Sequence, residues 1–446
     1  LDNQPKPRKS EVFEEYSDAA NLYWKENQSL ELIADISSRQ IDLLEKENYK
    51  TIDDVASMTE NSLSKISTAS LDKLKRQAFA QVNSTEDKTF IDLRNGDESI
   101  HFLHSLLPPE NPGDIYFDLE GYPFYDITSE YTMEYLYGVA FRDEKNNLIF
   151  KDDLWAESQE EEEIIFSKFI AWVENRIKEF PNLKIYHYAH YEKTSLLKSA
   201  QKFGKHEIEV DRWLNENRFV DLYEVVKKSF IVGKDSYSLK RIEEIAGYKR
   251  ELDLNSGIDS IYYFEKYLAT RDQKLKKEIL LYNRDDCVAT EKVCKWLRDQ
   301  QQEYLYNFDY IEEDERTPSE LDLELLELEQ KIININNPNL SQQIIEYIST
   351  MSGYFRREDR VKWQENFRLK QLPIEDKVND SSAFGYMSLI DTPAIEDNKC
   401  LLTYEILDGT FKKVSKGDSF VLLAFSNEYE VYELYATVEE VALSPF

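Results

Sequence analysis

Gly113-Asp-Ile-Tyr-Phe-Asp118-Leu-Glu120-Gly121 predicts a β-strand that carries two acidic side chains. Apolar residues flank and separate the acids, and side chains two residues apart on a strand share one face. At a rise of about 3.3 Å per residue, the two Cα atoms lie about 6.6 Å apart. This spacing suits carboxylates shared by two cations about 3.5–4 Å apart. An edge strand with two solvent-facing acids is the alternative, so the pair alone is weak evidence.

A second acid follows another strand pattern, Leu183-Lys-Ile-Tyr-His-Tyr-Ala-His190-Tyr-Glu192-Lys-Thr-Ser-Leu-Leu. The apolar residues before His190 indicate a buried strand, and the spacing after it indicates a helix. An acid just beyond the carboxyl end of a strand points into the crevice where open α/β sheets bind ligands. Glu192 is therefore a candidate site residue. The alternative is that it only stabilises the positive end of the helix dipole.

The third element is Leu281-Tyr282-Asn-Arg-Asp285-Asp286-Cys-Val-Ala-Thr-Glu, which follows a helix-forming stretch. Tyr282 and Asp286 are four residues apart and share a helix face. A phenol beside a metal-bound carboxylate can hold an attacking water molecule without being a strong base. A tyrosine that packs on its own helix is the alternative. The three elements in this order are more specific than any one of them.

The order Asp-x-Glu, an acid beside an aromatic residue after a strand, and Tyr-x-x-x-Asp resembles the DEDDy 3′–5′ exonucleases. That resemblance implies a ribonuclease H-like fold. The segments Tyr186-His-Tyr-Ala-His-Tyr-Glu-Lys-Thr and Tyr282-Asn-Arg-Asp-Asp-Cys-Val-Ala-Thr look like the nuclease domain of the RecB-like putative nucleases, which carry a fused superfamily 1 helicase. Proofreading exonucleases have aspartate where this chain has Glu192, one methylene longer.

The resemblance implies a role for each site residue. Asp118 would bridge two metal ions, Glu120 and Asp286 would complete one metal site, and Glu192 would act on the second ion, directly or through water. Tyr282 would orient the nucleophilic water. Mg²⁺ or Mn²⁺ fits, because hard cations prefer carboxylate oxygens. Two such ions lower the pKa of the attacking water and stabilise both the entering and the leaving oxygen.

Several neighbouring residues are weaker candidates. Asp285 points about 100° away from Asp286 on a helix, which favours a cap or surface acid over a ligand. Asp221 either lines the crevice or starts the next segment. The residues expected to contact nucleic acid, with a solvated face as the alternative, are Lys234, Lys240, Arg241 and His190.

The pattern predicts the α/β class, with a mixed sheet flanked by helices. We expect strands over 115–120, 135–141, 148–154 and 183–188, and helices over 160–179 and 191–202. The predicted organisation is a helical, helix–hairpin–helix-like module (1–85), a linker (86–112) with a short strand pattern at Phe90-Ile-Asp-Leu, the ribonuclease H-like domain (113–305), a helical connector (306–395) and a truncated, barrel-like β domain (396–446). In the N-terminal module, Asn48 stands where a hairpin glycine is usual, and asparagine tolerates the left-handed conformation. A helical spacer between nuclease domains is the alternative.

Composition sets limits on function. The 446 residues contain 55 Lys plus Arg and 87 Asp plus Glu, a net charge of −32. Such acidity argues against a protein that coats nucleic acid through phosphate contacts. It is compatible with a nuclease whose positive charge is local and partly supplied by ions. The chain has no GxxxxGK[ST] phosphate loop, so we expect no ATP hydrolysis. Three cysteines, with no membrane-spanning run and no signal-peptide pattern, lead us to expect a cytoplasmic protein.

These observations together predict a metal-dependent 3′–5′ exonuclease. We expect it to act on single-stranded ends, on DNA more than RNA, with a helicase domain in the same full-length polypeptide. A non-catalytic nucleic-acid-binding scaffold of a helicase and an endonuclease that uses the same site remain the alternatives.

Overall fold

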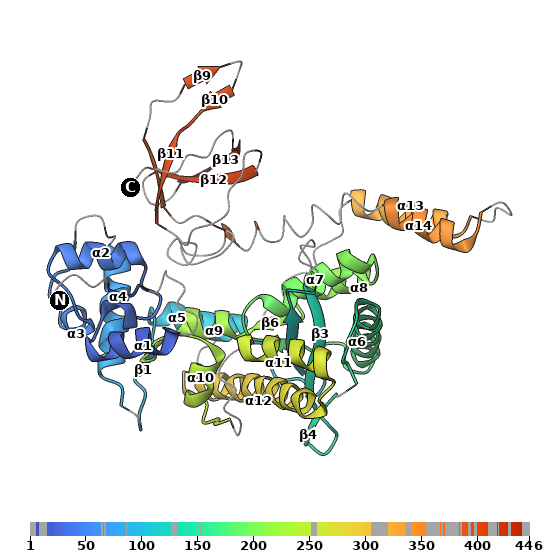
Figure 1. The fold of residues 1–446 in the computed structure, drawn as a ribbon, viewed down its shortest axis with the longest axis horizontal. Coiled ribbons are helices and arrows are strands. Elements are labelled where there is room, and N and C mark those ends of the chain that lie inside the picture. The colour runs from blue at the N-terminus through green and yellow to red at the C-terminus, as the bar shows by residue number, and fades with distance from the viewer. Residues whose placement is uncertain are drawn as a thin grey trace.

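The computed structural model places a mixed α/β core beside a set of N-terminal helices (Figure 1). It describes residues 6–8, 16–63, 66, 68–85, 87–125, 132–151, 153–250 and 257–304, and shorter stretches between residues 320 and 438. Among the helices of these residues, none combines the length and the apolar character needed to cross a membrane.

The core contains a five-stranded mixed sheet in the order β4-β3-β2-β5-β6. The strands are β2 (Ile115–Tyr122), β3 (Met133–Arg142), β4 (Leu148–Phe150), β5 (Ile185–His187) and β6 (Phe219–Asp221). β2 pairs with β3 in antiparallel and with β5 in parallel orientation. The predicted mixed sheet flanked by helices is therefore confirmed. The strand expected over 148–154 ends earlier, at Phe150.

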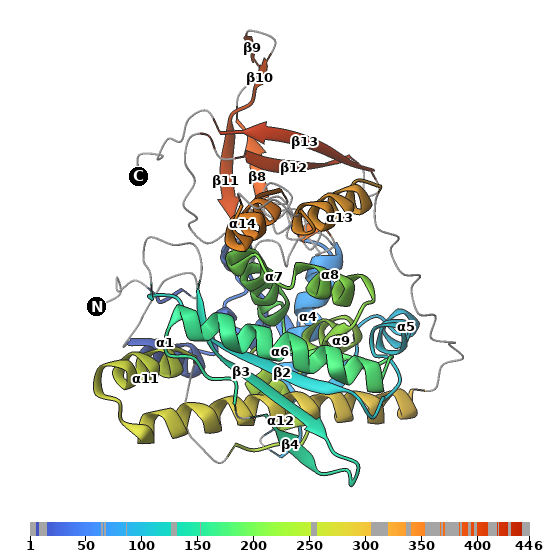
Figure 2. The same ribbon diagram turned by 90° about the vertical axis from the view of Figure 1, so that its right-hand side faces the viewer.

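Helices cover both faces of this sheet (Figure 2). One face packs against α6 (Gln159–Glu179), α7 (Tyr191–Phe203) and α8 (Glu207–Asn215). The other packs against α12 (Gln273–Glu303), α9 (Leu222–Ser229) and α5 (Asp97–Leu106). β2 supplies alternate residues to each side: Phe117 packs with α6, whereas Tyr116 belongs to the core on the α12 side. The two-residue period therefore turns Asp118 and Glu120 toward α12.

Helix α12 approaches the sheet closely at one point, which the absence of a side chain at Gly138 permits. A Cβ atom at Gly138 would lie 1.9 Å from the Oδ1 atom of Asn283. Gly138 is the register partner of Asp118 across β2 and β3. The contact therefore brings the middle of α12 over the acidic part of β2. Helix α11 (Gly257–Thr270) precedes α12 and also packs on the core.

A second, two-stranded sheet joins distant parts of the chain. β1 (Ile91–Leu93) pairs antiparallel with β7 (Phe230–Val232), which is followed by α10 (Leu239–Ile245). β1 and α5 both lie within 86–112, the segment expected to be a linker; β1 agrees with the short strand pattern at 90–93, whereas α5 was not expected. Leu103 of α5 is fully buried, so this segment packs as part of the fold.

The N-terminal helices surround a small core of their own. They are α1 (Ser17–Glu26), the 3₁₀ helix η2 (Leu30–Leu32), α2 (Ser38–Lys46), α3 (Ile52–Ala56) and α4 (Thr68–Val82). Ser37 and Thr51 form capping boxes at the starts of α2 and α3, so both helices begin where side-chain oxygens satisfy their first amides. Asn48, between them, has a φ of 70°, which confirms the left-handed conformation expected there.

The remaining elements lie in the last third of the chain. They are α13 (Glu320–Ile333), α14 (Gln342–Ser352), β8 (Tyr386–Leu389), β9 (Ala394–Glu396), β10 (Lys399–Leu401), β11 (Tyr404–Asp408), β12 (Ser419–Ser426) and β13 (Glu430–Thr437). The strands form antiparallel pairs. β8 and β9 begin before residue 396, where the β domain was expected to start. Large parts of 306–395 and 396–446, including 305–319, 371–382 and 439–446, lie outside the described residues.

Candidate metal centre

Three carboxylates from two distant segments meet between β2 and α12. Asp118 and Glu120 come from β2, and Asp286 comes from the middle of α12. One oxygen atom of each side chain lies within 4.8 Å of the others. Glu120 and Asp286 are buried and Asp118 is half-buried. The geometry therefore brings together three of the four acids that the sequence singled out as metal ligands.

The electrostatics of this cluster are unfavourable for three negative charges. Burial and then repulsion from Asp286 raise the pKa of Glu120 to about 8. Burial also raises the pKa of Asp286 to about 6, although Arg250 opposes that shift. Burial, with Asp286, Glu120 and Glu192 nearby, raises the pKa of Asp118 well above its usual value. Ionising all three acids requires compensating positive charge.

Two neutral side chains hold the acids of β2 in place. Nδ2 of Asn283 donates a hydrogen bond to Oδ2 of Asp118 (2.6 Å). Oγ of Ser260, from α11, donates to Oε2 of Glu120 (2.6 Å). Sequence analysis missed both. A signal existed for Asn283, because it shares the buried stripe of α12 with Tyr282 and Asp286. No such pattern marks Ser260.

Arg250 is a further residue that sequence analysis missed. Its Nη2 atom donates to Oδ1 of Asp286 (2.5 Å), and its Nε and Nη2 atoms bind the two oxygens of Glu243 (2.7 Å each). Glu243 belongs to α10. Arg250 follows α10 in a segment without helical or strand periodicity, so nothing in the local pattern marked it.

Glu192 is buried near the cluster but is not one of the three converging acids. It lies in the first turn of α7, after β5, as the sequence predicted. Its Oε2 atom is 3.5 Å from Nδ1 of His187, and that Oε2 has no hydrogen-bond partner among the described residues. Burial raises the pKa of Glu192, and His187 opposes the shift.

Asp221 fixes the backbone turn that carries Glu192. Its Oδ1 atom accepts hydrogen bonds from the backbone N–H groups of Ala189 (2.8 Å) and Tyr223 (2.9 Å). The first bond holds Ala189 at a φ of 70°, which is unusual for a residue with a Cβ atom. The second caps α9. Asp221 therefore has a positioning role at the carboxyl ends of β5 and β6.

Gly121 lets the start of α7 approach β2. A Cβ atom there would lie 2.1 Å from the hydroxyl oxygen of Tyr191. That hydroxyl donates to the buried Glu134 of β3 (3.0 Å to Oε2). Burial raises the pKa of Glu134 to about 7. Two hydrogen bonds therefore fix the turn that carries Glu192 to the sheet: one from the Ala189 amide to Asp221 and one from the Tyr191 hydroxyl to Glu134.

Tyr282 lies one helical turn before Asp286 and is buried. Lys240 Nζ lies 5.3 Å and Arg250 Cζ 5.5 Å from its ring centroid. Burial and the nearby Asp286, Glu120 and Asp118 raise the pKa of Tyr282. Its phenol therefore remains protonated and is able to donate a hydrogen bond.

The weaker candidates lie around this centre. Oδ1 of Asp285 accepts a hydrogen bond from the Tyr248 hydroxyl (2.7 Å). Lys234 pairs with Glu244, and Arg241 pairs with Asp235 and Glu244. His190 is exposed at the start of α7. Lys240 contacts the centre through the Tyr282 ring.

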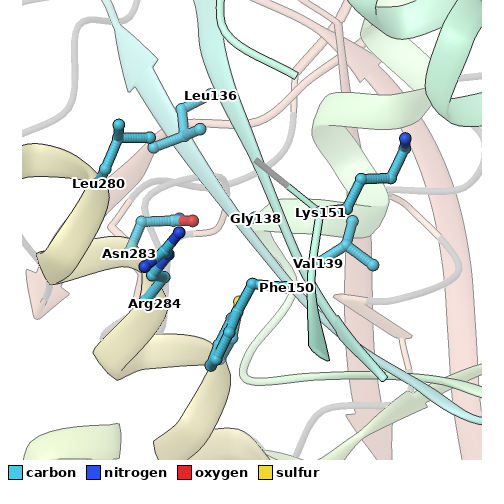
Figure 3. A pocket seen from close by; sticks show the side chains of 9 residues that line it. Leu136, Gly138, Val139, Phe150, Lys151, Leu280, Asn283 and Arg284 are labelled. Atoms are coloured by element: carbon cyan, nitrogen blue, oxygen red, sulfur yellow. The ribbon is translucent and has the colours of Figure 1, made fainter. Parts of the chain in front are cut away.

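A small pocket, partly open to solvent, lies between β3, β4 and α12. Figure 3 shows Asn283 and Arg284 of α12 facing β3 across this pocket, while Lys151 extends away from α12. Asn283 lines this pocket and also binds Asp118 through its amide. The acidic cluster itself is not part of the pocket lining.

The donor set fits a hard divalent cation. All three converging ligand atoms are carboxylate oxygens, which Mg²⁺ and Mn²⁺ prefer over softer ligands. A bound cation would also supply the positive charge that the shifted pKa values call for. Asp118, Glu120 and Asp286 would hold it.

Comparison with known proteins agrees with this architecture. Residues 115–298 match a family model described as the RNase_H superfamily. No curated protein matches the chain, and no solved structure matches it. The matched segment begins at β2 and ends within α12, so it contains the whole acidic centre. Residues 115–298 therefore form a ribonuclease H-like domain, and its acidic cluster fits a metal-dependent nuclease.

Proposed function

We propose that this protein is a divalent-metal-dependent 3′–5′ exonuclease of the DEDDy type that degrades single-stranded DNA as part of a larger helicase–nuclease. The observation that carries the proposal is the convergence of Asp118, Glu120 and Asp286 in a ribonuclease H-like domain, with Tyr282 one turn before Asp286. The preference for DNA, the 3′–5′ polarity and the helicase partner rest on the family resemblance of the motifs.

Each residue has a role in this proposal. Asp118, Glu120 and Asp286 bind the cations, with Asn283 and Ser260 holding the two carboxylates of β2. When bound, two Mg²⁺ or Mn²⁺ ions would activate water and neutralise charge on the phosphodiester oxygens. Glu192, whose Oε2 accepts no hydrogen bond among the described residues and lies 3.5 Å from Nδ1 of His187, would act on the second ion. The protonated Tyr282 donates a hydrogen bond that orients the attacking water.

Lys234, Lys240, Arg241 and His190 are proposed to contact the nucleic acid. Lys240 is the best placed of the four, because its ammonium lies over the ring of Tyr282. Lys234 and Arg241 must exchange their carboxylate partners for phosphates to take part.

End-labelled oligonucleotides incubated with Mn²⁺ test the activity. Wild-type protein should release nucleotides stepwise from the 3′ end of a single strand, and Asp118→Ala should abolish release. Asp299→Asn, an exposed change on the same helix, is the matched control and should retain activity. Stepwise release that persists in Asp118→Ala would refute the proposed site. Cleavage of a circular single strand would identify an endonuclease.

The ion pair between Arg250 and Asp286 favours one other function. A carboxylate neutralised by a buried guanidinium is also what a non-catalytic nucleic-acid scaffold would carry. Calorimetric titration with Mn²⁺ separates the two functions. The nuclease should bind Mn²⁺ in a manner that depends on Asp118 and Asp286, whereas a scaffold should not.

A further inference from the structure

Arg250 has an unusual position for a buried arginine. Only 9% of its side chain is exposed, and it sits between Glu243 of α10 and Asp286 of the acidic centre. Burying a guanidinium is costly unless its donors are satisfied. Nε and Nη2 are satisfied, but Nη1 has no hydrogen-bond partner among the described residues.

The rigid shape of the guanidinium shows where Nη1 points. Glu243 binds the edge formed by Nε and Nη2. The remaining N–H bond of Nη2 is directed at Oδ1 of Asp286. In a planar guanidinium, the outer N–H bonds of Nη1 and Nη2 are parallel and form a second fork. One N–H bond of Nη1 is therefore directed to the same side as Asp286.

We infer that this second fork of Arg250 binds a non-bridging oxygen of the substrate phosphodiester, through Nη1. The inference rests on the proposed nuclease function of the same centre. A phosphodiester held at the acidic centre lies beside Asp286, and so within reach of a donor that projects next to Asp286. Arginine forks match phosphate oxygens, and such charge-assisted hydrogen bonds are strong.

The surrounding contacts suit this role better than a purely structural one. Glu243 binds both Nε and Nη2, so it holds the guanidinium in place without help from Asp286 or the substrate. The ring of Tyr282 lies 5.5 Å from Cζ and restricts the guanidinium from one side. A structural arginine in this chain is satisfied differently: Nη1 of Arg218 donates to the carbonyl oxygens of Pro181 (2.7 Å) and Leu183 (3.3 Å).

Binding measurements without turnover test the inference. We would titrate Mn²⁺-loaded wild-type, Arg250→Gln and Arg250→Lys protein with thymidine 5′-monophosphate and with thymidine, using calorimetry. Arg250→Gln should weaken monophosphate binding at least tenfold and leave thymidine binding unchanged, since a charge-assisted hydrogen bond to the phosphate is lost. Its Mn²⁺ affinity should equal or exceed that of wild type, because a competing cation beside Asp286 is gone.

Arg218→Gln is the matched control, because Arg218 is equally buried and also paired with a glutamate, and should bind monophosphate as wild type does. If Arg250→Gln does not fold, the same titration of Arg250→Lys tests the inference, and this variant should also weaken monophosphate binding. Monophosphate affinity within twofold of wild type, or an equal loss of Mn²⁺ affinity, would overturn the inference. So would wild-type protein that binds Mn²⁺ but no monophosphate. A protein that binds both but cuts no DNA would instead overturn the proposed function.

Discussion

At the scale of single residues, the centre is a place where negative charges are held together against their mutual repulsion. Asp118, Glu120 and Asp286 gain hydrogen bonds from Asn283, Ser260 and Arg250, yet burial and repulsion still leave all three pKa values raised. Repulsion between the three carboxylates is unfavourable, and a bound cation would reduce it. Perturbed pKa values of this kind concentrate at functional sites.

The first prediction concerns the stability of metal-free protein against pH. The pKa of Glu120 is raised from 4.5 to about 8, so between these values the folded chain binds more protons than the unfolded chain. The contribution of Glu120 to the free energy of unfolding is therefore largest below about pH 4.5, and it is lost as the pH rises through about 8. In EDTA, the melting temperature should be lower at pH 8.5 than at pH 5.5, and Mn²⁺ should restore it at pH 8.5.

Glu120→Gln is the variant that isolates this effect. It should reduce the pH dependence measured in EDTA, while the contributions of Asp286 and Glu134, whose pKa values are also raised, remain. A melting temperature that climbs between pH 5.5 and 8.5 in wild-type protein without metal would contradict the prediction.

The second prediction concerns Asn283, which orients Asp118 without itself being a ligand. Asn283→Ala removes the 2.6 Å hydrogen bond to Oδ2 of Asp118. Loss of a group that orients a metal ligand typically lowers metal affinity about 10–100-fold. Calorimetric titration with Mn²⁺ should show a loss in this range. Asn147→Ala, in the turn between β3 and β4, should leave the affinity as it is in wild type.

At the scale of elements, the long periodic segments were predictable in both type and orientation. The short strands were predictable only in part: the patterns over 148–154 and 183–188 contain β4 and β5, whereas β6 and β7 were missed. The two-residue period of β2 and the apolar stripe of α12 are long enough to identify their type and their inward faces. β6 and β7 have three residues each, too few to show a period, and their pairing depends on partners far along the chain. The same reason applies to the contacts of Ser260 and Arg250, which only the tertiary structure brings to the acidic centre.

The third prediction concerns the close packing of α12 on β3. A Cβ atom at Gly138 would overlap the side-chain amide of Asn283, so Gly138→Ala should displace that amide from Asp118. We expect a loss of about 1–3 kcal/mol in the free energy of unfolding, as for other overpacked cores, and weaker Mn²⁺ binding. Because Asn283→Ala removes the overlapping atoms, the double variant should lose less stability than the sum of the two single variants.

Chemical unfolding and Mn²⁺ titration of the four proteins in this cycle provide the measurement. Gly96→Ala is the control: Gly96 has a φ of 55° but open space around a Cβ atom. It should destabilise the protein through backbone strain and leave Mn²⁺ affinity unaltered. Additive effects of Gly138→Ala and Asn283→Ala would mean that the two positions do not compete for the same space.

At the scale of the whole molecule, the net charge of −32 repels nucleic acid everywhere except where cations or local basic groups intervene. The N-terminal helices are packed next to the ribonuclease H-like domain, beside α5 and α9 (Figure 1). Both apolar and polar contacts join them: Ala34 packs in the core that includes Val232, and Gln77 makes hydrogen bonds. In α4, Gln77 Nε2 donates to the Val232 carbonyl (2.9 Å), and Gln77 Oε1 accepts from the Tyr237 hydroxyl (2.9 Å).

The fourth prediction is that Gln77 couples the helical module to the domain. Gln77→Ala leaves the buried Val232 carbonyl without this donor and the Tyr237 hydroxyl without this acceptor, and an unsatisfied buried group costs about 1–3 kcal/mol. Thermal unfolding should begin at a lower temperature. Limited proteolysis should cut faster in residues 83–85 and 87–90, which connect α4 to β1, because the two parts separate more often. Gln330→Ala, an exposed change in α13, should alter neither readout. Wild-type cleavage rates in Gln77→Ala would show that the two parts hold together without this residue.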